Sequence, residues 1–353
     1  MYRKVKMFFY SGTGNTFKIA KWFSELAAEK KMKTEFIPMN SAKSLKLEEK
    51  DQDSLLGILF PIHALTAPLS VIKFALSLPE GKGQECFILA NRGGGSFLKT
   101  DPGCEGSGTY LIAVIMKLKG YRVKGVSAID MPANWNALHP SYREATINFI
   151  LDRGRKKTRD FAEQALNGRS VYKGFIPFTI GVVFLPVSIA YIFVGRLILA
   201  KMFFANYKCN HCGVCEKICP NKAIKLKGRK SPMPYWSFSC ESCMRCIAYC
   251  PQKAIEFQQA LFILMIYIFS LPLAGWIVKP MTEFFGSGGV SGLFSCLLQL
   301  LSGIGVAFLL QWMLNVAVRN PVLNRFFTFT TLTHVFKRYH EPSTSCNDLT
   351  KRN

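Results

Sequence analysis

Cysteines at regular spacing are the residues of this sequence whose chemistry is most readily recognised. Eight of the 12 cysteines lie between positions 209 and 250, in two runs that each read C-x2-C-x2-C-x3-C-P. In such runs three thiolates bind one [4Fe–4S] cluster, while the fourth cysteine reaches the other cluster. The spacing therefore predicts two clusters. One set of ligands is Cys209, Cys212, Cys215 and Cys250, and the other is Cys240, Cys243, Cys246 and Cys219.

The cysteine segment also contains an internal duplication. Lys222-Ala223-Ile224 after the first run recurs as Lys253-Ala254-Ile255 after the second, which is typical of a repeated structural unit. Structural zinc is the alternative, but it favours two separated C-x2-C pairs and gives no reason for a third cysteine or a trailing proline. The segment 205–258 resembles the two-cluster bacterial ferredoxins, and the resemblance implies a small α+β domain.

A loop of small and hydroxyl-bearing residues separates an apolar run at 5–10 from a helical pattern that begins at Thr16. Backbone N–H groups at a helix N-terminus lack intrahelical acceptors, and the helix dipole is positive there, so the loop suits a phosphate. No Gly-Lys-Ser/Thr of a P-loop follows, and Phe17 takes the third glycine position of the dinucleotide fingerprint. A monophosphate fits best, and an ordinary glycine-rich turn is the alternative. The loop residues are Ser11, Gly12, Thr13, Gly14, Asn15 and Thr16.

Residues 1–168 resemble a flavodoxin domain, whose FMN-phosphate loop reads Ser/Thr-x-Thr-Gly-Asn-Thr. The resemblance implies FMN as a cofactor, with two further loops beside the flavin ring at the carboxyl ends of the third and fourth strands. Trp135 is a further candidate for a ring contact. The loop residues so implied are Pro61, Ile62, His63 and Ala64, and then Asn91, Arg92, Gly93, Gly94 and Gly95.

Strands and helices must position these loops. Apolar runs predict five strands, which alternate with helical patterns; the runs are 5–10, 34–38, 55–60, 86–90 and 122–129. This alternation is typical of a parallel sheet. We therefore expect an α/β fold with a flavodoxin-like, doubly wound, five-stranded parallel sheet, together with the small ferredoxin domain and α-helical membrane segments.

Long apolar stretches lie outside the two cofactor domains. The stretch 174–200 is long enough for the roughly 20 residues of a membrane helix, but Pro186 interrupts it, and we expect a re-entrant or interfacial segment bent at that proline. Residues 259–318 predict a transmembrane helical hairpin, followed by a basic cytoplasmic tail at 319–353. The polar composition of 340–353 predicts disorder.

The charge balance indicates an anionic partner. Lys and Arg total 45 against 22 Asp and Glu, a formal net charge of +23. Basic residues flank the apolar stretches, which places the redox domains on the cytoplasmic side of the cell membrane. Anionic lipid is the expected partner of the basic surface. No nucleic-acid-binding module is evident, so no nucleic acid is expected.

FMN and iron–sulfur clusters on one chain predict a membrane-bound electron-transfer protein, because flavin passes one or two electrons and each cluster passes one. The chain is similar to flavodoxin–ferredoxin fusion proteins, and we expect a soluble redox protein as donor or acceptor. No catalytic residue is recognised, so whether the chain is an enzyme stays open. One alternative is a flavin-dependent oxidoreductase that reduces a membrane quinone or another small molecule, and another is a redox sensor.

Overall fold

The structure of the chain is a computed structural model, which describes residues 2–41, 53–94, 102–229, 231–270, 301, 305–306, 308–310 and 312–351. Backbone contacts divide the chain into two units. The first unit comprises Met1–Ile192, Cys243–Tyr249 and Lys337–Asn353, and the second comprises Phe193–Ser242 and Cys250–Phe336.

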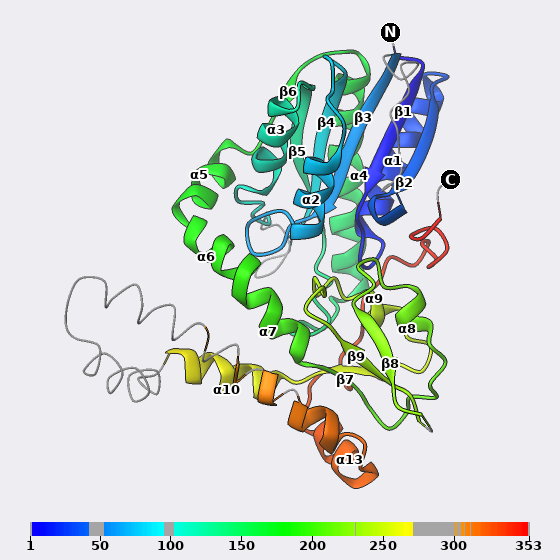
Figure 1. The fold of residues 1–353 in the computed structure, drawn as a ribbon. Helices are drawn as coiled ribbons and strands as arrows, with labels where there is room; N and C mark the ends of the chain where they lie inside the picture. The colour runs from blue at the N-terminus through cyan, green and yellow to red at the C-terminus, as the bar shows by residue number, and fades with distance from the viewer. Residues whose placement is uncertain are drawn as a thin grey trace, which may run out of the picture. The chain divides into compact units, whose positions relative to one another are not determined.

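A six-stranded sheet forms the centre of the first unit, and all its neighbouring strands are parallel (Figure 1). The strand order is β2-β1-β3-β4-β5-β6. The strands are β1 Lys4–Phe9, β2 Lys33–Pro38, β3 Ser54–Pro61, β4 Glu85–Gly94, β5 Arg122–Pro132 and β6 Val171–Tyr172. The predicted parallel α/β sheet is confirmed. It has one strand more than predicted, because β6 is too short to show an apolar pattern.

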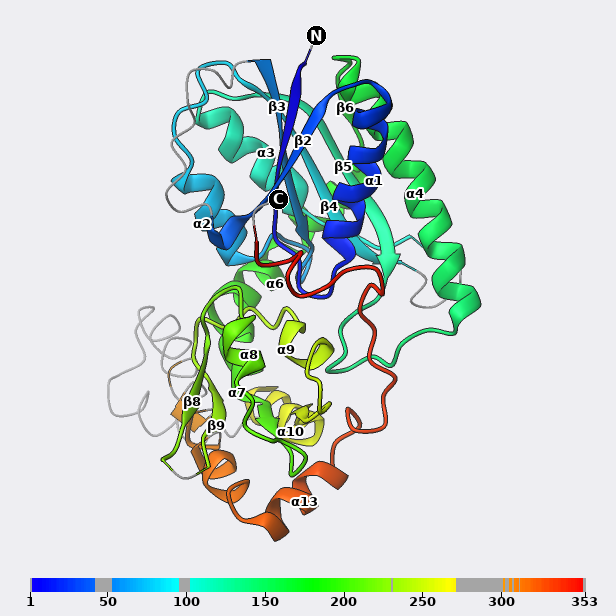
Figure 2. The ribbon, with the colours of Figure 1, turned by 90° about the vertical axis from the view of Figure 1, so that its right-hand side faces the viewer.

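Helices cover both faces of this sheet, with α1 and α4 on one face and α2 and α3 on the other (Figure 2). Alternate residues of a strand point to opposite faces. Accordingly Met7 and Phe9 enter the core under α1 and α4, while Phe8 enters the core under α2 and α3. The sheet is therefore doubly wound. The four helices are α1 Asn15–Glu29, α2 Leu69–Ser77, α3 Gly108–Leu118 and α4 Glu144–Leu166.

The strand order also explains where a ligand site belongs. From β1 the chain first adds β2 on one side and then β3 on the other. The loops after β1 and β3 therefore diverge to opposite faces, and ligands of open α/β sheets bind at such a switch point, beyond the carboxyl ends of the strands.

The apolar stretch at 174–200 is broken into short helices, α5 Phe175–Val183, α6 Leu185–Ala190 and α7 Arg196–Lys201. The bend of 72° falls between Val183 and Leu185 rather than at Pro186 itself. Pro186 lacks the N–H that a continuous helix would direct at the carbonyl of Val182, so α5 ends and Pro186 lies in the first turn of α6. No single helix of the described ranges is long and apolar enough to cross a membrane. The bent pair formed by Phe175–Val183 and Leu185–Lys201 is long and apolar enough when its two parts are taken together.

The second unit contains two antiparallel strand pairs, β7 with β10 and β8 with β9. The ring of Phe203 packs against those of Trp236 and Phe257, with centroids 5.8 and 5.2 Å apart. Helix α10 continues from β10, and most of the predicted hairpin at 259–318 lies outside the described residues. The elements are β7 Phe203–Ala205, α8 Val214–Lys217, β8 Ile224–Lys227, β9 Met233–Trp236, β10 Ile255–Phe257, α10 Gln259–Ser270 and α13 Pro321–Phe329.

Candidate functional site

The predicted phosphate loop lies between β1 and α1, at the switch point of the sheet. Gly14 has φ of +99°, a left-handed conformation that a residue with a side chain rarely adopts. Ser11 Oγ accepts a hydrogen bond from Gly14 N at 3.2 Å, and Thr13 Oγ1 accepts one from Asn134 Nδ2. Because both hydroxyls act as acceptors here, their own O–H groups remain able to donate to a ligand.

Buried donors of this loop fit a phosphate. Within the described part of the chain, the backbone N–H groups of Thr13, Asn15 and Thr16 donate to no protein acceptor. All three residues are at most 2% exposed. A buried N–H without an acceptor is costly, and a phosphate dianion would supply acceptors at the positive end of α1. The loop residues therefore fit the phosphate group of FMN.

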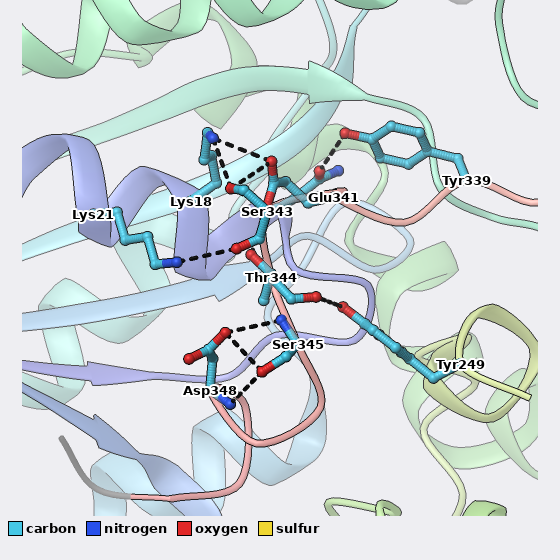
Figure 3. Close-up of polar contacts among 10 residues, drawn as sticks. Lys18, Lys21, Tyr249, Tyr339, Glu341, Ser343, Thr344, Ser345 and Asp348 are labelled. Carbon is cyan, nitrogen blue, oxygen red and sulfur yellow. Dashed lines mark hydrogen bonds and ion pairs between the residues drawn. The ribbon is translucent and has the colours of Figure 1, made fainter.

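A C-terminal segment, residues 337–349, lies against the outside of this loop (Figure 3). We call it the strap. Glu341 N donates to Thr13 O at 2.8 Å, and Tyr339 Oη donates to Asn15 Oδ1 at 3.1 Å. A Cβ built on Gly14 would lie 2.8 Å from Glu341 Cβ, so only glycine leaves room for this contact. Leu349 is fully buried in the core that covers α1. The disorder predicted for 340–353 is therefore wrong over the described part of that tail.

Glu341 is the residue of the strap that forms an ion pair with α1. Its carboxylate forms an ion pair with Lys18 Nζ at 3.1 Å and accepts hydrogen bonds from the hydroxyls of Ser343 and Thr344. Burial acts to raise the pKa of Glu341, but the hydrogen bonds from Thr344, Ser343 and Lys18 outweigh it and lower the pKa overall. Glu341 is therefore charged at neutral pH.

The loop after β3 holds Pro61, Ile62, His63 and Ala64, the first residues implied to lie beside the flavin ring. Burial lowers the pKa of His63 to about 4, so its ring is neutral at pH 7. His63 Nδ1 lies 3.4 Å from Tyr191 Oη, and Ser188 Oγ donates to Ala64 O at 2.9 Å. The end of the bent apolar segment therefore packs directly on this loop.

The second implied ring loop differs from expectation, because β4 extends to Gly94 and includes Asn91, Arg92 and Gly93. Asn91 accepts a hydrogen bond from the Thr16 hydroxyl, which ties β4 to the phosphate loop.

Arg92 is buried and paired with two carboxylates, those of Glu105 and Asp130. Its guanidinium is thus occupied by protein carboxylates, so Arg92 holds the end of β4 in place. Trp135 is 43% exposed, and Gly95 lies outside the described residues. Contacts of these side chains with a flavin ring stay predictions.

The first predicted set of cluster ligands lies together in the second unit. Burial, and the neighbouring thiols of Cys209, Cys250 and Cys212, raise the pKa of Cys215 to about 12. Burial together with Cys250 and Cys212 also raises the pKa of Cys209. Four thiols crowded in this way resist ionisation until a cation binds them, and bound iron provides that positive charge. The donor set therefore fits a cluster.

The duplication predicted from the sequence appears in the backbone around the cysteines. Six residues, three in each half, have left-handed φ angles between 49° and 72° and stand at matching positions. They are His211, Gly213 and Lys222 in one half and Ser242, Met244 and Lys253 in the other. The sulfur that ends each run also accepts a backbone N–H: Ala223 N donates to Cys219 Sγ and Ala254 N to Cys250 Sγ. Strained backbone repeated in this way is typical of a functional site.

In the second predicted set, Cys219 and Cys240 belong to the second unit, and Cys243 and Cys246 to the first. Among all described residues, no three His, Cys, Asp or Glu side chains are grouped so that they could hold one metal ion. Zinc requires ligands that converge on one ion. A [4Fe–4S] cluster instead takes one cysteine for each of its irons.

Sequence reasoning missed Lys201, a lysine in α7 that is fully buried. Its ammonium donates to Trp236 O at 2.7 Å and lies 4.1 Å from the Phe238 ring centroid. Burial lowers the pKa of Lys201 to about 8, against an opposing interaction with Cys240. A buried lysine directly after an apolar stretch cannot be distinguished in sequence from a helix-end residue that reaches solvent.

Residues 243–249, which we call the cluster-binding segment, contact the phosphate loop inside the first unit. A Cβ built on Gly12 would lie 1.8 Å from Cys243 O, so the two backbones touch. The Arg245 guanidinium, 2% exposed, donates to Ser11 O. The cysteine spacing predicts the ligands of this segment but carries no signal for its contact with residues far away in the sequence.

Comparisons with known proteins agree with part of this description. Residues 208–254 match the 4Fe-4S dicluster domain family. This segment is therefore an iron–sulfur domain, and an electron-transfer role follows. No curated protein sequence matches the chain.

Three solved structures are similar to the chain at low identity. A flavodoxin from the domain Archaea is 17% identical with a TM-score of 0.31, and covers 46% of this chain and 99% of its own. Flavodoxin 1 from Bacillus cereus is 14% identical with a TM-score of 0.31, over 46% of this chain and 97% of its own. Rubredoxin oxygen:oxidoreductase from Desulfovibrio gigas is 13% identical with a TM-score of 0.28, and the match covers 47% of this chain and 37% of its own. The assignment of a flavodoxin-like fold rests on the strand order β2-β1-β3-β4-β5.

Proposed function

We propose that this chain is a membrane-associated electron-transfer protein that passes electrons between FMN and two [4Fe–4S] clusters. The contact between the phosphate loop and the cluster-binding segment carries the proposal. Gly12 lies against Cys243 O, and Arg245 donates to Ser11 O. A flavin phosphate site and a cluster ligand therefore share one packed region of the first unit.

Bound FMN would supply chemistry that exchanges one or two electrons, and each cluster exchanges one. The protein's own residues bind and shield these groups. The backbone donors of Thr13, Asn15 and Thr16 would hold the phosphate, while the strap covers their loop from outside. His63, neutral at pH 7, brings no positive charge to the β3 loop.

The membrane part of the proposal is supported by the bent segment α5–α6. Ile176 and Val183 are each 73% exposed, and Phe175 is 70% exposed. A run of large apolar side chains exposed to this extent marks an interaction surface. Lipid is favoured as its partner, since the chain is strongly basic and anionic headgroups attract such a surface.

A second candidate function is the flavin-dependent reduction of a membrane quinone. One observation favours it: Ser188 and Tyr191 of the apolar segment contact the loop of His63 and Ala64. An apolar molecule at this segment would therefore lie close to the loop implied to flank the flavin ring.

The cofactor assignment is tested by purifying the full chain anaerobically in detergent and measuring extracted flavin, iron and sulfide. We expect one FMN and two [4Fe–4S] clusters per chain. Thr13→Val should weaken FMN binding about tenfold, because the buried site loses a donor to the phosphate. The control Thr179→Val, at an exposed position of α5, should bind FMN normally. Purified chain without flavin, in which added FMN also fails to bind, would overturn the proposal.

The choice between carrier and enzyme needs a second measurement. Reduced ferredoxin is mixed with the loaded chain in a stopped-flow instrument, with and without a quinone, while flavin and cluster absorbance are followed. A carrier holds its electrons until a second redox protein arrives. If a quinone reoxidises the flavin and clusters over many cycles, the protein is an enzyme rather than a carrier.

A further inference from the structure

The two halves of the cysteine repeat share a backbone but differ in their surroundings. Cys212 and Cys243 occupy equivalent positions, and so do Val214 and Arg245. Cys212 is exposed, whereas Cys243 packs against the core under α2 and α3. Arg245 is buried, whereas Val214 is partly exposed. The two halves therefore match in backbone and differ in the burial of equivalent side chains.

In the second half, the cluster-binding segment is fixed to the flavodoxin-like sheet domain at both its ends. At one end the Cys243 carbonyl lies against Gly12, and Arg245 donates to Ser11 O. At the other end Tyr249 Oη donates to Thr344 O of the strap at 3.0 Å (Figure 3). Its ring also lies 4.9 Å from that of His340. Two independent attachments therefore hold the segment that carries Cys243 and Cys246, one to the phosphate loop and one to the strap.

We propose that the two clusters have different partners: the cluster bound by Cys243 and Cys246 exchanges electrons directly with the flavin, and the cluster bound by Cys212 exchanges them with an external protein. This inference rests on the proposed function and assigns an order to its cofactors. When electrons flow from the flavin to the external protein, reduced flavin first loses one electron and one proton, and the proton passes to water. The electron reduces one ferric iron of the nearer cluster to ferrous. A second transfer, after the first electron has moved to the farther cluster, completes the oxidation of the flavin.

The exposed half also indicates the chemistry of the external partner. Three exposed lysines lie in the sequence around the first cysteine run, Lys208, Lys217 and Lys222, while a fourth, Lys225, is paired with Glu216. Positive charge around an exposed redox centre attracts negatively charged proteins and raises their association rate. The partner is therefore a soluble redox protein with an acidic surface, and its association should slow as salt concentration rises.

The matched pair Cys212→Ser and Cys243→Ser tests this order. Each variant should lose the iron and sulfide of one cluster, and each should lose electron delivery to an external acceptor. The discriminating measurement is the internal step, followed as bleaching of the remaining cluster after the flavin is photoreduced under anaerobic conditions. Cys212→Ser should keep the parent rate within about twofold. Cys243→Ser should slow the step at least tenfold.

A second pair leaves every cluster ligand in place, in case loss of a cluster unfolds its domain. Arg245→Leu removes the hydrogen bond to Ser11 O, and Val214→Leu changes the equivalent position of the other half. Both should retain full iron content. Arg245→Leu should slow the transfer from flavin to cluster several-fold, and Val214→Leu should leave it unchanged. Equal rates in both pairs, or a slower step in the Cys212 and Val214 variants, would overturn the order of the clusters. A parent chain that shows no transfer would instead overturn the proposed function.

Discussion

At the residue scale, we expect one buried charge to tune the potential of a cluster. Lys201 is fully buried and interacts electrostatically with Cys240. A positive charge beside a cluster favours its reduced, more negative state, so Lys201→Met should make the midpoint potential of that cluster more negative. A potentiometric titration followed by EPR measures this change.

The control for Lys201 is Lys208→Met, because Lys208 is exposed and water screens its charge. Methionine fills much of the volume of the lysine stem, so the iron content of both variants should match the parent. Equal shifts in the two variants would contradict a specific role for the buried ammonium.

A second prediction at the residue scale concerns acid. The folded-state pKa of Glu341 is lowered, so the stabilisation from its ionised form is complete above the ordinary glutamate pKa of about 4.3. It is lost as the pH falls through the lower, folded-state value, because protonation breaks the ion pair with Lys18. Glu341→Gln should therefore flatten the acid limb of a plot of unfolding free energy against pH.

That acid limb is measured by urea unfolding at a series of pH values from neutral downward. Asp348→Asn is the comparison variant. Asp348 also has a lowered pKa, so this substitution should remove its own part of the acid limb, but the Asp348 carboxylate accepts from Ser345 within the strap, so the ion pair between Glu341 and Lys18 stays in place. If Glu341→Gln keeps the acid limb of the parent, that ion pair contributes nothing to it.

At the scale of elements, the strap packs on the sheet domain, and Leu349 anchors it in the core around α1. Leu349→Ala leaves a cavity in the core around α1 and should cost about 2–4 kcal/mol of unfolding free energy. Leu118→Ala, at a position that is 83% exposed, should change stability by less than about 0.5 kcal/mol. Denaturant unfolding of the two variants measures the difference. Similar small effects would mean that the strap is not anchored through this residue.

The strap also shows which elements can be predicted from the sequence. The five main strands were predictable because buried parallel strands are continuous apolar runs, as 55–60 and 86–90 illustrate. The strap was not, because its polar composition resembles that of a disordered tail. Its order comes from contacts with distant residues, such as Tyr339 with Asn15 and Asn136.

The same contrast holds for the candidate sites. The phosphate loop and the cysteine ligands are predicted from local spacing, which the sequence shows directly. The contacts of Arg92, Lys201 and Arg245 could not be predicted, because each depends on partners that only the fold brings near: Glu105 and Asp130, Trp236, and Ser11. The position of the helix break, two residues before Pro186, likewise depends on a missing backbone donor rather than on the proline ring alone.

At the scale of the whole molecule, we expect the net charge of +23 and the exposed apolar segment to favour the same partner. Apolar side chains of α5 and α6 would enter the boundary of a bilayer, and the basic residues would be attracted to anionic headgroups. We therefore expect slower amide hydrogen exchange in residues 175–190 when the full chain is placed in nanodiscs that contain anionic lipid than in purely zwitterionic ones.

Charged substitutions separate this segment from the remaining apolar sequence. Ile176→Asp and Val183→Asp each place a carboxylate on the exposed apolar face, and burying it in the membrane boundary would be costly. Both should remove the protection of 175–190 by anionic lipid. Leu118→Asp is the control, since Leu118 is highly exposed but lies in α3. Exchange at 175–190 that is the same in both lipids, and unaffected by either substitution, would mean that this segment does not lie on the bilayer and that the basic charge serves protein partners alone.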